Sequence, residues 1–120
     1  MTTQEGGCHC GRVRFLTEGT PKFVSRCHCN SCRKTTGAAF STWVGYSADC
    51  VKWTGAAPAF YASSAGVKRG FCASCGTPLS YESDKWPGER HLLIGAFDDP
   101  RAFTPTGDFL KDEALAWVRT

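Results

Sequence analysis

The sequence predicts a mainly β domain. Short segments rich in aromatic and β-branched residues recur between Gly, Pro, Ser and Asp breaks, which is typical of strands joined by turns. The chain has 120 residues, of which 42% are hydrophobic and 21% charged. These values exclude a disordered or fibrous chain and suit one folded domain over residues 1–120. Eight cysteines, several times the ordinary usage, fall in small groups along the chain.

Seven segments show the strand pattern. In Arg12–Thr17, apolar Val13 and Phe15 alternate with two arginines, which predicts one buried face. His91–Phe97 is a more continuous apolar run, so we place it centrally in a sheet and end it at the turn Asp98-Asp99-Pro100. The other predicted strands are Lys22–Arg26, Phe40–Val44, Val51–Thr54, Val67–Phe71 and Pro78–Tyr81.

One segment has helical spacing. In Asp112–Val118, Asp112 suits an N-cap, and Leu115 and Val118 fall on one helical face. We therefore expect at most a short helix of two turns there.

The cysteines form a C-x-C pair, a C-x-C-x-x-C run, a C-x-x-C pair and a lone Cys50. Residues i and i+2 of a strand share a face, so a C-x-C strand would aim two sulfurs at one point and turn His9 and His28 away. The C-x-x-C pair precedes Gly76, which can take the positive φ that closes a zinc knuckle.

Two zinc sites follow from this grouping. Cys8, Cys10, Cys72 and Cys75 supply the four ligands of a closed structural site that pins the N-terminal strand to the middle of the chain. Three thiolates remain close together, and three protein ligands with an open fourth position are typical of a catalytic zinc. These are Cys27, Cys29 and Cys32.

Three alternatives compete with this interpretation. Cys50 could close the second site and make both sites structural, although it has no paired neighbour and suits a small core residue. Disulfides are disfavoured because MTTQEGG has no secretory signal pattern, which points to the reducing cytosol. A redox C-x-x-C pair is disfavoured because a Gly-Thr-Pro turn follows it instead of a helix.

The charge and hydropathy of the chain bound its partners. The formal net charge is +3, but seven thiolates and two Zn²⁺ would bring it to zero, so bulk charge does not support nucleic-acid binding. No apolar run approaches the length of a membrane span, so we expect no membrane partner.

The cysteine motifs and the segments around them, taken in order, resemble the glutathione-dependent formaldehyde-activating enzyme family, which includes the centromere protein V group. The resemblance runs from about Gly7 to Pro100 and implies a β-tent, a folded set of antiparallel sheets carrying zinc. It also implies a structural zinc on Cys8, Cys10, Cys72 and Cys75 and a zinc linked to glutathione on Cys27, Cys29 and Cys32. The motifs that carry it are Gly7-Cys8-His9-Cys10-Gly11, Cys27-His28-Cys29-x-x-Cys32, Arg69-Gly70-Phe71-Cys72-x-x-Cys75-Gly76 and Gly95-x-Phe97-Asp98-Asp99-Pro100.

The sequence departs from the family at one position. Family members commonly carry Pro-x-x-His near the C-terminus, where this chain has Pro105-Thr106-Gly107-Asp108. A carboxylate in place of an imidazole is expected to repel an anionic ligand such as glutathione.

The function that we predict is a carbon–sulfur lyase-type activity. The open zinc, which three ligands hold less firmly than four, would keep a glutathione-like thiol as its nucleophilic thiolate and join it to an aldehyde such as formaldehyde. Arg33 and Lys34 could meet substrate carboxylates or form a solvated basic turn, and Lys68 and Arg69 share this ambiguity. Trp86 is the tryptophan expected nearest a cleft. The rival hypothesis is a non-catalytic zinc module that binds another macromolecule.

Overall fold

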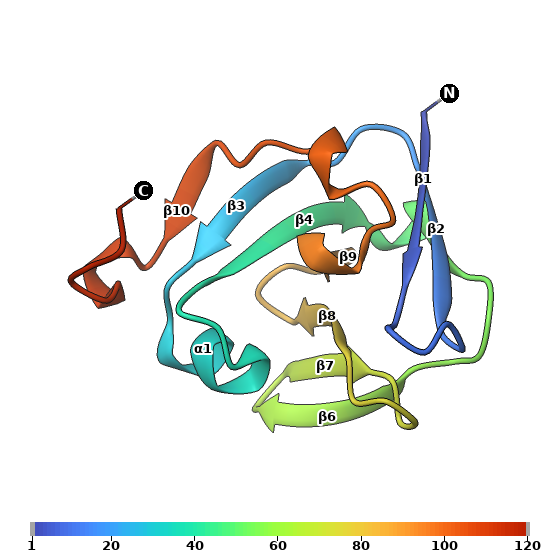
Figure 1. Ribbon diagram of the computed structural model, residues 1–120, viewed down its shortest axis with the longest axis horizontal. Helices are drawn as coiled ribbons and strands as arrows, with labels where there is room; N and C mark the ends of the chain where they lie inside the picture. The colour runs from blue at the N-terminus through green and yellow to red at the C-terminus, as the bar shows by residue number, and fades with distance from the viewer. Residues whose placement is uncertain (1, 120) are drawn as a thin grey trace.

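The computed structural model describes residues 2–119 (Figure 1). Met1 and Thr120 lie outside the described residues, and a single domain over 1–120 stays a prediction. Within the described part the chain is mainly β, as predicted, with one short α-helix, α1 (Asn30–Thr36). The strands are β1 (Thr3–Gly7), β2 (Arg14–Glu18), β3 (Phe23–Cys27), β4 (Ser41–Ser47), β5 (Val51–Trp53), β6 (Ala59–Ser64), β7 (Val67–Phe71), β8 (Pro78–Ser83), β9 (Glu89–Leu93) and β10 (Gly107–Phe109).

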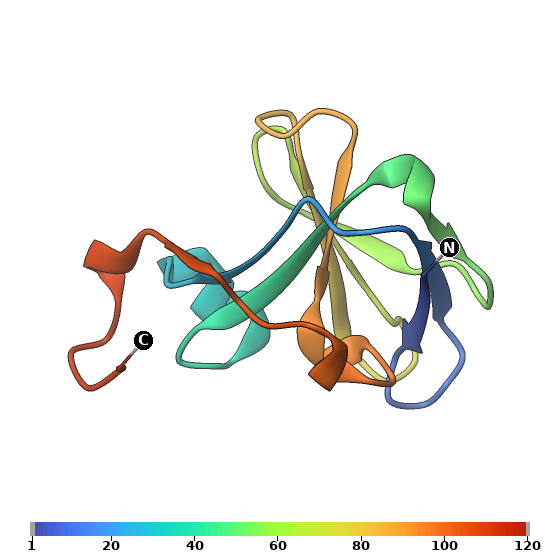
Figure 2. The same ribbon diagram turned by 90° about the horizontal axis from the view of Figure 1, so that it is seen from above.

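The strands form two sheets. The smaller has the order β1-β2-β5, and the larger has the order β10-β3-β4-β9-β8-β7-β6. Within residues 2–119 the strand pairs are antiparallel, except that β10 runs parallel to β3. The smaller sheet and the β10 segment lie at opposite ends of the molecule in both views (Figures 1 and 2).

The hydrophobic core lies between the two sheets. Phe15 of β2 is fully buried and contacts Phe97 edge-on, with their ring centroids 5.0 Å apart. Val13 is buried beside it, so the predicted apolar face of this segment is confirmed. An isolated bridge between Gly6 and Phe97 brings β1 against the segment that follows β9, and a β-carbon at Gly6 would overlap the Phe15 ring. This close approach requires glycine.

All seven predicted strands are present, Val67–Phe71 with the predicted ends and the other six with shifted ends, and three strands were missed: β1, β6 and β10. The central position expected for the His91 segment is confirmed, because β9 lies between β4 and β8. The expected strand to Phe97 is wrong beyond Leu93, where Ile94–Ala96 forms a 3-10 turn closed by the Phe97 N–H on the Ile94 carbonyl at 3.2 Å.

The predicted helix over Asp112–Val118 is also wrong. Lys111–Glu113 is a 3-10 turn instead, entered through Leu110 in the left-handed region at φ 52°, and Asp112 lies inside the turn. The helix forms at Asn30–Thr36, where the Cys29 sulfur caps the N-terminus and Gly37, at φ 73°, ends it. It was missed because its cap is a cysteine and it lacks an amphipathic stripe.

Among residues 2–119, no helix has both the length and the hydropathy needed to span a bilayer.

Candidate metal centres

The structure brings seven of the eight cysteines together in two groups. Within each group the sulfur atoms lie within 4.8 Å of one another. The first group joins Cys8 and Cys10 to Cys72 and Cys75, and the second comprises Cys27, Cys29 and Cys32. All eight cysteines are free thiols, so the structure gives no support to the disulfide alternative.

The first group links two turns that are distant in sequence. The Cys8 and Cys10 sulfurs are 3.5 Å apart, and the Cys10 and Cys72 sulfurs are 3.8 Å apart. A tetrahedral zinc with Zn–S bonds near 2.3 Å needs sulfurs about 3.8 Å apart. The donor set and its spacing therefore fit a closed zinc site.

The expected strand geometry of the C-x-C pair is wrong. Cys8 follows the end of β1, and the Gly11 N–H donates to the Cys8 carbonyl at 3.1 Å, which closes a tight turn. The Val13 N–H donates to the Cys8 sulfur at 3.3 Å. A turn, like a strand, can direct two sulfurs to one point, and it also supplies N–H groups to them.

The Cys72–Cys75 pair forms the expected knuckle. Gly76 takes φ 82°, as predicted, and the Cys75 N–H donates to the Cys72 sulfur at 3.5 Å. The Thr77 hydroxyl lies 3.1 Å from the Cys75 sulfur, and its hydrogen bond lowers the pKa of that thiol to about 5. The local chain thus favours the thiolate form that binds metal.

The second group surrounds the start of α1. Cys27 ends β3, Cys29 caps the helix, and Cys32 lies in its first turn. The Cys32 N–H donates to the Cys29 sulfur at 3.2 Å. A hydrogen bond from the Cys27 thiol, helped by the positive charge of Arg69, lowers the pKa of Cys32 to about 5. The same hydrogen bond raises the pKa of Cys27, since it favours the protonated donor.

Arg69 of β7 lies against this group. It is therefore neither part of a solvated basic turn nor free to bind a substrate carboxylate, the two alternatives that the sequence left open. Its Nη1 and Nη2 atoms are 3.8 and 3.9 Å from the Cys32 sulfur, and its side chain is buried. The guanidinium also donates to Thr35 and Ser63 at 3.1 Å each. Arg69 thus places a fixed positive charge beside thiolates and ties α1 to the edge of the larger sheet.

A cavity of about 560 Å³ opens beside Cys27, Cys29 and Cys32, which all line it. This volume is in the usual range for small-molecule sites. Cys50 belongs to neither group among the described residues and packs against the core instead. The structure therefore gives no support to Cys50 as a fourth ligand.

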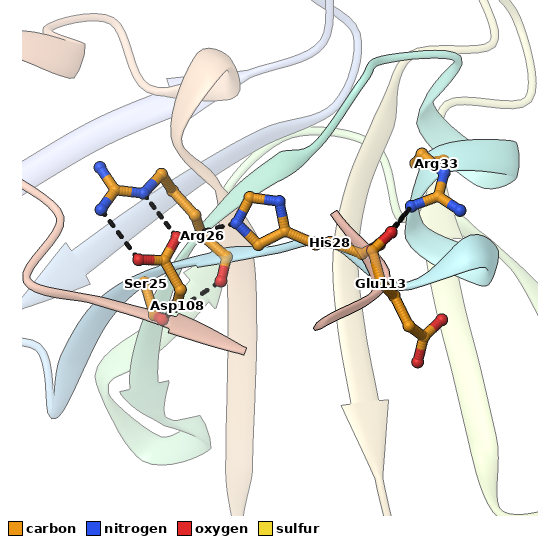
Figure 3. Close-up of polar contacts among 6 residues, drawn as sticks. All are labelled: Ser25, Arg26, His28, Arg33, Asp108 and Glu113. Atoms are coloured by element: carbon orange, nitrogen blue, oxygen red, sulfur yellow. Dashed lines mark hydrogen bonds and ion pairs between the residues drawn. The ribbon is translucent and has the colours of Figure 1, made fainter. Parts of the chain in front are cut away.

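The side chains of Arg33 and Asp108 are engaged away from this cavity (Figure 3). Arg33 donates to the carbonyls of His28 and Glu113, so of the two alternatives for this residue the contact with a substrate carboxylate is not supported. Asp108 accepts from Arg26 Nε at 2.8 Å and lies 2.8 Å from His28 Nε2.

The expected repulsion of anions by Asp108 is therefore corrected. Hydrogen bonds from Arg26, and then from His28, hold the pKa of Asp108 well below its usual range. The negative charge is matched by the Arg26 guanidinium, and the side chain is not among those lining the cavity.

The comparisons with known proteins agree with this geometry. The family profile described as glutathione-dependent formaldehyde-activating enzyme matches residues 3–112. The chain belongs to this family.

A curated relative of this formaldehyde-activating family comes from Halomonas elongata and carries the provisional name glutathione-dependent formaldehyde-activating enzyme. It is 33% identical over an alignment that covers 78% of this chain and 65% of the relative. The chain thus spans less than two thirds of that relative's length. A crystal structure of a Rhodobacter sphaeroides protein, 20% identical, has a TM-score of 0.70 and covers 88% of this chain and 99% of its own. At that identity, it supports the fold alone.

Several residues that line the cavity were missed by sequence reasoning. Phe23, Tyr81 and His91 all face it from the larger sheet. Their alternation along short strands was visible, but the pairing that gathers them from three strands was not.

Proposed function

We propose that the protein is a zinc-dependent enzyme of the carbon–sulfur lyase type. It would form or break an S-hydroxymethyl-type adduct between a thiol and an aldehyde such as formaldehyde. The observation that carries the proposal is a group of three cysteines that borders a cavity of ligand size. Family membership supports the same chemistry, with glutathione as the first thiol to test.

The residues present fit two zinc ions per chain. Both groups are all-sulfur, the donor type that zinc accepts in closed and open sites. A zinc on Cys27, Cys29 and Cys32 would supply one function, which is to hold a substrate thiol in its thiolate form. We also propose the cytosol as the compartment, since ligation needs reduced thiols.

The chain itself contributes charge and position. Three thiolates and one Zn²⁺ carry a net charge of −1, which the Arg69 guanidinium beside Cys32 offsets. In the reaction, the substrate sulfur forms a bond to the carbonyl carbon and the carbonyl π bond breaks. The proton released by the thiol returns to the oxygen, so no oxidant or reductant is needed.

The test is isotope exchange between formaldehyde and its glutathione adduct, followed by NMR. Protein with two zinc ions per chain is expected to accelerate the exchange, whereas Cys32→Ser should lose one zinc and the acceleration. Cys50→Ser, outside both groups, is the matched control and should retain both. If wild type and Cys32→Ser exchange at the same rate with every thiol tested, the enzyme proposal is wrong and the non-catalytic zinc module takes its place.

A further inference from the structure

The cavity beside the second cysteine group has an aromatic wall. The rings contact one another: the Phe23 centroid lies 4.7 Å from His91 and 5.7 Å from Phe109, and the Trp43 and Tyr81 centroids are 5.8 Å apart. The Trp86 ring centroid lies 5.9 Å from that of His91 and 5.9 Å from that of Phe109. The six residues of this aromatic wall are Phe23, Trp43, Tyr81, Trp86, His91 and Phe109.

Strand register builds this wall. Phe23 pairs with Gly45, Gly45 with His91, and His91 with Tyr81, so the row crosses β3, β4, β9 and β8. A β-carbon at Gly45 would overlap the Phe23 ring. Glycine therefore lets the Phe23 ring lie across β4 and contact His91. Phe23, His91 and Tyr81 therefore lie on the face of the sheet that carries Cys27, and Trp86 joins them from the turn between β8 and β9.

The cavity offers little free positive charge to an anionic substrate. Among the described residues that line it, Arg69 and Lys85 are the cations, and Arg69 is committed to Cys32, Thr35 and Ser63. The Glu113 carboxylate also lines the cavity. Glutathione carries two carboxylates and one ammonium group. Glu113 can pair with the ammonium group, but Lys85 can serve only one of the two carboxylates, and each carboxylate needs a cationic partner on desolvation.

We propose that the thiol substrate has a compact apolar or aromatic body and that glutathione is a poor match for this cavity. The inference rests on the proposed function, because it assumes that the substrate sulfur approaches Cys27, Cys29 and Cys32. The aromatic wall then buries the body of the thiol, a favourable contact that a charged tripeptide makes less well.

Direct binding tests this substrate class without turnover. Co²⁺ replaces zinc, and benzyl mercaptan and glutathione are titrated separately against the loaded protein. Tryptophan fluorescence reports the aromatic wall, and the visible cobalt bands report sulfur at the metal. We expect benzyl mercaptan to bind at least about tenfold more tightly than glutathione. Equal binding, or tighter binding of glutathione, would overturn the proposal.

Matched tryptophan variants assign the preference to the wall. Trp86→Ala should lower the affinity ratio of benzyl mercaptan to glutathione several-fold, whereas Trp117→Ala, 69% exposed and outside the cavity lining, should leave it unchanged. Phe109→Ala, compared with the exposed Phe60→Ala, repeats the test if Trp86→Ala fails to fold. An unchanged ratio in the folded wall variant contradicts the inference.

The isotope exchange separates the two proposals. If the protein accelerates exchange with neither thiol, the proposed function is rejected. If it accelerates exchange of the glutathione adduct more than exchange of the benzyl mercaptan adduct, only the substrate class is rejected.

Discussion

At the scale of single residues, buried charge contacts hold the metal-binding loop in place. Asp108 joins β10 to Arg26 and to His28, and His28 lies fully buried between two cysteines of the second group. The His28 N–H also donates to the Phe109 carbonyl at 3.1 Å. Asp108 therefore positions Cys27 and Cys29 without itself lining the cavity.

We predict that Asp108→Asn weakens binding of the second zinc. The substitution removes the negative charge that Arg26 and His28 share, and outer partners of metal ligands typically change metal affinity about 10–100-fold. Competition with a chromophoric chelator measures the affinity of each site. Asp112→Asn, at an exposed position, is the control. Equal zinc affinity in the two variants would show that Asp108 has no positioning role.

His91 gives stability a pH dependence. Burial lowers its pKa, so the unfolded chain binds more protons than the folded chain as pH falls below the usual value near 6.5. The free energy of unfolding should therefore fall through this range and level off below the folded-state pKa. Urea unfolding of wild type and His91→Gln at several pH values measures the difference, with exposed His9→Gln as control. If His91→Gln keeps the full pH dependence of the free energy of unfolding that the wild type shows, the effect belongs to other groups.

At the scale of elements, register explains what the sequence could and could not predict. The burial of Val13 and Phe15 was predictable because alternation is local. The helix at Asn30–Thr36 was not, since a cysteine sulfur caps it and short metal-binding turns carry no amphipathic period. The cysteine groups followed from spacing and chemistry, whereas the aromatic wall depends on pairings between distant strands.

Gly45→Ala tests the register of the wall. The new methyl group would overlap the Phe23 ring, so we expect a loss of about 1–3 kcal/mol in the free energy of unfolding and a changed fluorescence of Trp86. Gly95→Ala is the matched control, because a β-carbon there meets nothing within 4 Å. Denaturant titration compares the two variants. Similar stabilities would mean that Phe23 does not need the space above Gly45.

For the molecule as a whole, the first cysteine group links the smaller sheet to the larger one. Cys8 and Cys10 lie in the turn between β1 and β2, and Cys72 and Cys75 lie in the turn between β7 and β8. A metal ion held there would add to the folding free energy of both sheets. The second group lies at the end of β3 and the start of α1, where the buried Cys27 and Cys32 pack with Trp43 in a smaller cluster apart from the main core.

The two groups should therefore differ on substitution. Cys75→Ser is expected to unfold the chain or lower its melting temperature strongly, whereas Cys32→Ser should keep the fold and lose one zinc. Circular dichroism and zinc content of each purified variant provide the measurement. A stable Cys75→Ser protein with native circular dichroism would show that the first group is not structural.

The central claim is that Cys27, Cys29 and Cys32 hold a zinc whose fourth position faces the cavity. A crystal structure of the zinc-loaded protein, with anomalous diffraction at the zinc edge, tests it most directly. We expect three cysteine sulfurs on the zinc and one solvent or thiol ligand on the cavity side. A fourth ligand supplied by the chain itself would contradict it.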